Sequence, residues 1–334
     1  MSSEASSAPP PGLPRVLVVR HAEVQRDFYR VIEDWIRQYE PQYDGLLDVQ
    51  DLPFSLPLGA ARGRPYGAMV PWLQDPVESW SQPTYDQTQS LQLACDALAM
   101  PVLNRVESLT NAGKSRGAML MGAAGLHVPK MALITNAEEF HETLLGIPLP
   151  LFVREDWGHG AIAWSIASPA DARATPLARF KRPVAVQWVD TSGADSLFRK
   201  YRYFAAGDAG ISHHLQCSTH WMTRGHNREV TDLTRMQELA YVEHPDVHHA
   251  LFQKARLALG LDMVAFDYGL GRDGLPVVWE ANPFPFIQFS TGKLTYRNSA
   301  LHRTMYAILR LYLRSAGLSV DPRIEDIVAY RRRE

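Results

Sequence analysis

The sequence contains little cysteine, no excess of either charge and no long hydrophobic run. Two cysteines in 334 residues, Cys95 and Cys217, are too few for a disulfide scaffold and have no metal-ligand spacing. This cysteine usage fits a reducing compartment, and we expect the cytoplasm. No run approaches the roughly 18 apolar residues that span a membrane, so we expect no membrane partner.

Charge is nearly balanced, with 34 Lys and Arg against 36 Asp and Glu. A general nucleic-acid binder normally has a basic excess or stripe, so we expect no nucleic-acid partner. Residues 1–14 are rich in Ser and Pro and lack the charged and apolar regions of a secretion signal. We expect them to form a disordered tail.

The chain is long enough for two or three compact units, and 46% of its residues are hydrophobic. A strand at 15–20 and a helix at 23–39 predict a small α/β unit, which we extend to residue 103. Residues 41–83, rich in Pro and Gly, allow no assignment. The rest predicts an α+β fold with antiparallel sheets: strands at 151–154, 161–164, 184–189, 198–206 and 213–223, helices at 85–99, 245–259 and 301–316, and a hairpin at 261–284.

The hairpin segment, LDMVAFDYGLGRDGLPVVWEANPF, carries the strongest signal. Two β-prone runs flank Gly-Arg-Asp-Gly, and Asp273-Gly274 predicts a two-residue turn. Counting outward from that turn places Asp267 directly opposite Glu280. Two facing carboxylates repel each other unless a cation or a proton lies between them.

Asn282 lies two residues past Glu280 and therefore projects from the same face of the strand. Carboxylate and amide oxygens are suitable ligands for Mg²⁺, which completes its octahedron with water and phosphate oxygens. The sequence thus predicts a metal site at Asp267, Glu280 and Asn282. A hairpin with one solvated acidic face is the alternative.

The segment ALGLDMVAFDY…LPVVWEANPFP resembles the metal-binding end of the ATP-grasp superfamily, whose members carry an Asp on one strand and Glu-x-Asn on the next. The resemblance extends through NRVES, GLHVP and QWVD and covers about residues 104–313. It implies two antiparallel-sheet lobes, residues 104–185 and 186–334, that sandwich ATP after an N-terminal unit at 15–103. It also implies Mg²⁺, which Mn²⁺ could replace.

The resemblance further implies residues that bind ATP. We expect Asn111 to cap a helix with Lys114 in its first turn, although an exposed lysine there is the alternative. Arg154 stands where the family usually has Lys, and two acids follow it, so the phosphate grip is altered or the loop needs ordering by substrate. The resemblance implies that Gln187 to Asp190 form the hinge that meets the adenine, and a plain buried strand is the alternative there. The implied ATP-binding residues are Lys114, Arg154, Gly158, His159, Gly160, Gln187, Trp188, Val189 and Asp190.

A basic group surrounds the strand predicted at 198–206, where Lys200 and Arg202 share one face. In a ligase, Arg202 and Arg224 would hold the substrate carboxylate and the developing phosphate charge. Salt bridges on an exposed strand are the alternative. Four histidines match no zinc spacing and are taken as polar strand or loop residues: His213, His214, His220 and His226.

The resemblance implies a carboxylate–amine ligase, similar to ribosomal-protein glutamate ligases and glutathione synthetase-like enzymes. ATP would phosphorylate an acid, and a small-molecule or peptide amine would attack the acyl phosphate. An ATP-grasp kinase and a non-catalytic nucleotide-binding module stay open, as does a homodimer. Arg20-His21 also resembles the histidine phosphatase signature, but no partner segment accompanies it.

Overall fold

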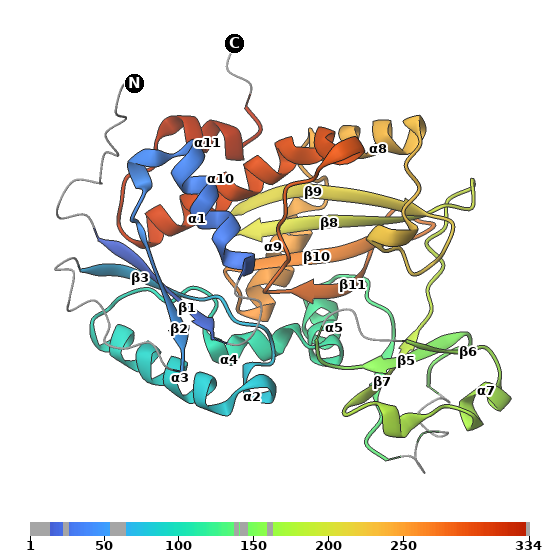
Figure 1. Ribbon diagram of the computed structural model, residues 1–334. Coiled ribbons are helices and arrows are strands. Elements are labelled where there is room, and N and C mark those ends of the chain that lie inside the picture. Colours follow the sequence, from blue (N-terminus) through green and yellow to red (C-terminus); the bar gives the residue numbers. More distant parts are fainter. Residues whose placement is uncertain are drawn as a thin grey trace.

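The described residues form three β-sheets (Figure 1). The structure is a computed structural model that describes residues 14–22, 27–53, 65–136, 140, 146–158 and 163–331. The first sheet is parallel, with the order β2-β1-β3. The second has the order β4-β7-β5-β6 and the third the order β11-β10-β8-β9, and both are antiparallel. The predicted α+β fold with two antiparallel sheets is confirmed.

The parallel sheet forms the N-terminal unit. Its central strand is buried along its whole length, as is usual for a parallel strand covered on both faces. The predicted strand and helix are confirmed over the described residues, whereas β2 and β3 lie in the segment that allowed no assignment. The elements are β1 (Arg15–His21), α1 (Asp27–Tyr39), β2 (Leu47–Leu52), β3 (Tyr66–Pro71), α2 (Val77–Trp80) and α3 (Gln82–Ala97).

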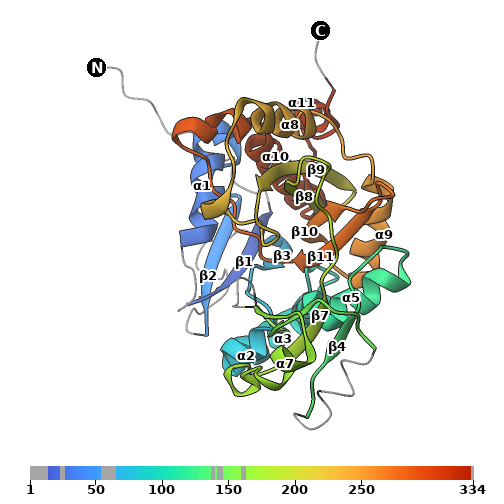
Figure 2. The same cartoon turned by 90° about the vertical axis from the view of Figure 1, so that its right-hand side faces the viewer.

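The smaller antiparallel sheet lies below the larger one in Figure 2. Two short helices, α4 (Val106–Leu109) and α5 (Lys114–Ala123), precede it, and α5 packs against both β4 and β11. The strand expected at 161–164 begins at Trp164 in the structure, and residues 159–162 lie outside the described part. The elements are β4 (Met131–Leu133), β5 (Leu151–Glu155), β6 (Trp164–Ile166), α7 (Pro169–Arg173) and β7 (Pro183–Gln187).

The larger antiparallel sheet carries helices on both sides (Figure 1). Helices α8 and α10 pack against β9, and α9 packs against β8 and β10. The strand predicted at 198–206 has those bounds in the structure, whereas α8 and α11 were not predicted. The elements are β8 (Phe198–Ala206), β9 (Ala209–Ser218), α8 (Asp232–Val242), α9 (His249–Leu259), β10 (Met263–Leu270), β11 (Pro276–Asn282), α10 (Asn298–Ser315) and α11 (Pro322–Val328).

The β10–β11 hairpin confirms the predicted pairing of Asp267 with Glu280, but the predicted two-residue turn is wrong. The Gly271 N–H donates to the Leu275 carbonyl at 2.9 Å, and the Gly274 N–H donates to the Gly271 carbonyl at 2.9 Å. The loop therefore has three residues, and Gly274 adopts φ 76°, the left-handed conformation that such a loop needs. This loop shifts the register by one residue relative to the predicted count.

A second irregularity cancels that shift. Asp267 faces Glu280 while Tyr268 faces Val278, so Trp279 is an extra, unpaired residue in β11. The Trp279 ring lies so close to Gly269 that a Cβ there would fall 2.6 Å from a ring carbon. Gly269 thus leaves room for the bulged indole, and the two acids face each other after all.

One hydrophobic core joins the N-terminal unit to the larger antiparallel sheet. It contains Val16 and Val18 of β1, Phe204 of β8, and Ile308 and Tyr312 of α10. The C-terminal helices therefore stabilise both parts together. The division into units at 15–103, 104–185 and 186–334 stays a prediction, and its boundary at 185/186 falls inside β7.

Both cysteines are buried and free. Within the described ranges, the helices are all too short or too polar to cross a membrane.

Candidate functional site

A cavity of about 720 Å³ lies between the two antiparallel sheets. The smaller sheet contributes Phe152 and Val186, and the larger sheet contributes Lys200, Asp267 and Glu280. A cleft of this size suits a nucleotide-sized ligand. The two sheets therefore form opposite walls of one site.

A single row of four side chains crosses the larger sheet inside this cavity. Glu280 on β11 pairs with Asp267 on β10, which pairs with Arg202 on β8, which pairs with His214 on β9. All four residues line the cavity. Neighbouring strands hold directly paired side chains close together on one face, so the row places two acids and a guanidinium side by side.

Cations hold both acids in this structure. Arg202 donates to Asp267 through Nε at 2.6 Å and through Nη2 at 2.9 Å, which is a bidentate pair. The Lys200 Nζ lies 3.5 Å from Asp267, and Arg154 lies 3.9 Å from Glu280 across the cavity. The predicted shared face of Lys200 and Arg202 is confirmed, because both reach the same carboxylate.

These pairs set the ionisation of the row. Burial raises the pKa of Asp267, but the charges of Arg202 and Lys200 outweigh it and keep that pKa below its usual value. Burial lowers the pKa of Arg154, and the charge of Glu280 opposes that change. Asp267 is therefore an anion at neutral pH, as a metal ligand must be.

Asn282 completes the predicted ligand set. It lies on the same strand as Glu280, lines the cavity, and accepts the Phe284 N–H at 2.8 Å through Oδ1. In the described part of the chain, no cluster of three His, Cys, Asp or Glu side chains could hold a metal by itself. Two carboxylates and an amide instead fit a cation such as Mg²⁺, which keeps part of its shell for water and phosphate.

Lys114 lies where the smaller sheet meets α5. Its Nζ donates to the Gly158 carbonyl and lies 3.5 Å from the Asp156 carbonyl. Burial, with a contribution from Arg154, lowers the pKa of Lys114 to about 8. A buried lysine that faces the cavity and donates to two backbone carbonyls can turn toward an anionic ligand.

The expected cap of this helix is wrong. Gly113 is the N-cap of α5, and the Asn111 side chain instead donates to the Leu259 carbonyl at 2.9 Å. The first turn receives its acceptor from another element, because the Ser115 N–H donates to Asp156 Oδ1 at 2.8 Å. Asp156 thus ties the end of β5 to the start of α5 and fixes Lys114 beside Arg154.

Solved structures similar to this chain identify the fold. A RimK-domain ATP-grasp protein from Sphaerobacter thermophilus DSM 20745 is 17% identical, with a TM-score of 0.56, over 89% of this chain and 98% of its own. The ATP-grasp ligase PsnB is 15% identical, with a TM-score of 0.54, over 99% of both chains. The D-Ala:D-Ser ligase VanG from Enterococcus faecalis is 11% identical, with a TM-score of 0.55, over 90% of this chain and 99% of its own.

The chain has an ATP-grasp fold. No family model and no curated protein matches the sequence. At such low identity, the likeness establishes the arrangement of the lobes and leaves the chemistry to be argued from the residues.

Three of the four hinge residues predicted in this ATP-grasp fold line the cavity: Gln187, Trp188 and Val189. Asp190 does not. Its Oδ1 accepts from the Ser192 N–H and hydroxyl at 3.0 and 2.7 Å, and its Oδ2 lies 3.4 Å from Arg272. Gly158 also lies outside the cavity lining, and His159 and Gly160 lie outside the described residues.

Several cavity residues of this ATP-grasp fold were not predicted from sequence. Arg224 lines the cavity as predicted, and Arg228 and Arg297 join it from loops far apart in the chain. His213 and His214 were set aside for lack of a zinc spacing, yet both face the cavity. Arg202 pairs with His214 while Tyr203 pairs with Ser212, so His213 is an extra residue in β9 and shares a face with its neighbour.

His21, which suggested a histidine phosphatase, lies at the end of β1. It lines a separate small cavity with Trp72 and Phe284 and does not line the cavity of the ATP-grasp fold. No second histidine accompanies it there among the described residues. The site therefore gives the phosphatase hypothesis no support.

Proposed function

We propose that the protein is an ATP- and Mg²⁺-dependent ligase that joins a carboxylate to an amine. The observation that supports this most strongly is the row of Glu280, Asp267 and Arg202 inside the cavity between two antiparallel sheets. A substrate carboxylate oxygen would attack the γ-phosphorus, and ADP would leave. The amine nitrogen would then attack the acyl carbon, phosphate would leave, and the amine would lose a proton.

The similar structures support the nucleotide and the metal. PsnB has been solved with a precursor peptide and AMPPNP, and with a minimal precursor, Mg and ADP. VanG is a D-Ala:D-Ser ligase. These ligands are those of the neighbours, and we extend them to this chain because its cavity offers two carboxylates, an amide and several cations in the corresponding fold.

Asp267, Glu280 and Asn282 would hold the metal, which supplies positive charge to the β- and γ-phosphates. Arg202 would move from Asp267 to the transferring phosphoryl group once a cation takes its place. Arg224, which also lines the cavity, would orient the substrate carboxylate.

The remaining roles concern ATP. Lys114 and Arg154 would contact the phosphates, and Gln187, Trp188 and Val189 would enclose the adenine. The roles expected for Gly158, His159, Gly160 and Asp190 stay predictions. We also retain the cytoplasm as the expected location, since both cysteines are free thiols.

Nucleotide turnover with defined substrates tests the proposal. A panel of acids and amines should stimulate ADP release only when an acid and an amine are present together, and mass spectrometry should detect the amide. A phosphorylated product without an amide would indicate a kinase instead. ATP binding without turnover across the panel would indicate a nucleotide-binding module.

Proton uptake tests the phosphate role of Lys114. The pKa of Lys114 is lowered to about 8 in the free protein, and nearby phosphates should raise it. Lys114 should therefore take up a proton when the nucleotide binds near pH 8. ADP affinity should therefore fall as the pH rises through 8. Calorimetry in buffers of different ionisation enthalpy measures the uptake.

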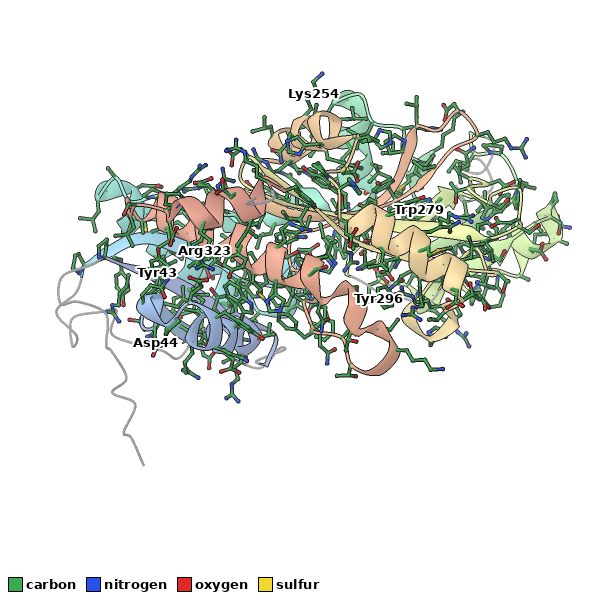
Figure 3. The ribbon with its side chains drawn as sticks, turned by 90° about the horizontal axis from the view of Figure 1, so that it is seen from above. Tyr43, Asp44, Lys254, Trp279, Tyr296 and Arg323 are labelled. Atoms are coloured by element: carbon green, nitrogen blue, oxygen red, sulfur yellow. The ribbon has the colours of Figure 1, made fainter. Side chains whose placement is uncertain are left out.

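Lys114→Gln should abolish this proton uptake and weaken ADP binding by about 10-fold at pH 7, the effect of one charge-assisted hydrogen bond. Lys254→Gln is the matched control, because Lys254 on α9 is exposed and points away from the molecule (Figure 3). Equal proton uptake in the wild type and Lys114→Gln would exclude the phosphate role.

A further inference from the structure

Two arginines that line the cavity, Arg228 and Arg297, share a buried carboxylate. Arg228 precedes α8 in the chain, and Arg297 ends the turn before α10. Both pair with Glu238 of α8, which is fully buried, and Arg297 lies 4.0 Å from it. Tyr296 also donates to Glu238 and accepts from Arg228 at 3.0 Å, and Figure 3 places Tyr296 beside α8. Glu238 and Tyr296 thus position the two arginines.

The arginines retain unused donors. The Arg228 side chain is 6% exposed and lines the cavity, yet its Nε and Nη1 have no hydrogen-bond partner among the described residues. The Nε of Arg297 is likewise buried and unpartnered within that part of the chain. A buried guanidinium N–H without an acceptor is costly, so these donors indicate a ligand that supplies acceptors.

The charge of the cavity exceeds what a nucleotide needs. Seven cationic side chains among the described residues line it, against two carboxylates. The cavity lining therefore has a surplus of five positive charges, which the buried Glu238 reduces to four. A triphosphate with one Mg²⁺ carries only about two net negative charges. The cations are Lys114, Arg154, Lys200, Arg202, Arg224, Arg228 and Arg297.

Arg228 and Arg297 line the same cavity as Arg202 and the proposed metal ligands. Burial, with the charges of Arg202 and Arg297, lowers the pKa of His213 to about 3. Arg202 and Arg297 therefore both act on this one imidazole. Arg202 and Arg297 also contribute to the lowered pKa of His214. The neutral histidines of β9 line the same cavity as Arg202 and Arg297, so one substrate in that cavity can meet both arginines.

We propose that Arg228 and Arg297 form a carboxylate clamp for a second, non-reacting carboxylate of the acid substrate. This inference rests on the proposed ligase function and narrows its substrate class to a dicarboxylate or an acidic peptide. One carboxylate lies at Arg202 and the metal ligands, and the other accepts from the free donors of Arg228 and Arg297. A guanidinium pair of this kind favours planar, bidentate recognition of a carboxylate.

Binding of glutarate and glutaramate tests the clamp, because these probes differ only in whether the second group is charged. The full-length protein is first saturated with ADP and Mg²⁺, and each probe is then titrated by calorimetry. The wild type should bind glutarate about 10- to 100-fold more tightly than glutaramate, the range for charge-assisted bonds. Arg228→Gln and Arg297→Gln should bring that ratio close to one.

Controls separate the clamp from folding. Arg37→Gln removes an exposed arginine on α1 and should keep the wild-type ratio. Arg228→Lys keeps the charge but lacks the planar guanidinium. Its glutarate-to-glutaramate affinity ratio should lie between those of the wild type and Arg228→Gln. Each variant should bind ADP as the wild type does, which shows that the cavity is intact.

Other outcomes overturn the clamp. These are an unchanged glutarate-to-glutaramate affinity ratio in both Arg228→Gln and Arg297→Gln, no binding of glutarate by the nucleotide-saturated wild type, or a preference for alanine over alaninamide without a preference for glutarate. The last result would assign the carboxylate to the amine substrate. Failure of ADP to bind would instead refute the proposed function, and the same probes would then test the clamp in the nucleotide-free protein.

Discussion

Asp267→Asn is expected to lower substrate-dependent ADP release by at least about 100-fold, because one charged metal ligand is lost. The substitution keeps the shape of the side chain but removes the charge that would neutralise the cation. It also leaves Arg202 beside an uncharged amide in a cavity already rich in cations. A coupled assay of ADP release at saturating Mg²⁺ measures the effect.

The matched control is Asp273→Asn in the same hairpin. Asp273 is exposed in the turn, where its Oδ1 accepts the Leu275 N–H at 3.0 Å, and an asparagine can keep that bond. This variant should turn over ATP as the wild type does. Wild-type turnover in Asp267→Asn would show that Asp267 is not a metal ligand.

Asn104→Ala is expected to destabilise the protein by about 3 kcal/mol or more, since three backbone groups, two of them in the buried Met263, lose their partner. The Asn104 Oδ1 accepts from the N–H groups of Asp262 and Met263 at 2.7 and 2.9 Å, and its Nδ2 donates to the Met263 carbonyl at 2.8 Å. Its φ of 54° also suits asparagine better than alanine. Urea unfolding monitored by circular dichroism measures the loss.

Two further variants show whether the lost hydrogen bonds or the left-handed backbone conformation causes most of the destabilisation. Asn104→Gly relieves the backbone conformation but loses the same three bonds, so it should remain strongly destabilised. Ser196→Ala changes an exposed residue with a similar φ of 61°, and should cost about 0.5 kcal/mol or less. A small effect in both Asn104 variants would show that this residue does not anchor the start of β10.

The hairpin shows why part of the site could be predicted. Alternation along a strand and the short distance between its two strands placed Asp267, Glu280 and Asn282 together. The predicted turn was nevertheless wrong, because Arg272, Asp273 and Gly274 form a three-residue loop. The pairing held only because the bulge at Trp279 restores the register. Local turn signals constrain the loop, whereas a bulge depends on packing across the sheet.

Other features depend on distant contacts that local patterns do not encode. Asn111 is a favourable capping residue by type, but Asp156 supplies the acceptor for the first turn of α5. His213 and His214 share a face only because β9 carries an extra residue. Arg228 and Arg297 meet through Glu238, which belongs to a helix that the sequence analysis did not assign.

A crystal structure of the protein with Mg²⁺ and a non-hydrolysable ATP analogue tests most directly whether the hairpin holds the metal. We expect Mg²⁺ within about 2.0–2.1 Å of oxygens from Asp267, Glu280 and Asn282, with Arg202 moved onto a phosphate. A metal bound elsewhere, with Arg202 still paired to Asp267 through both nitrogens, would contradict the proposal.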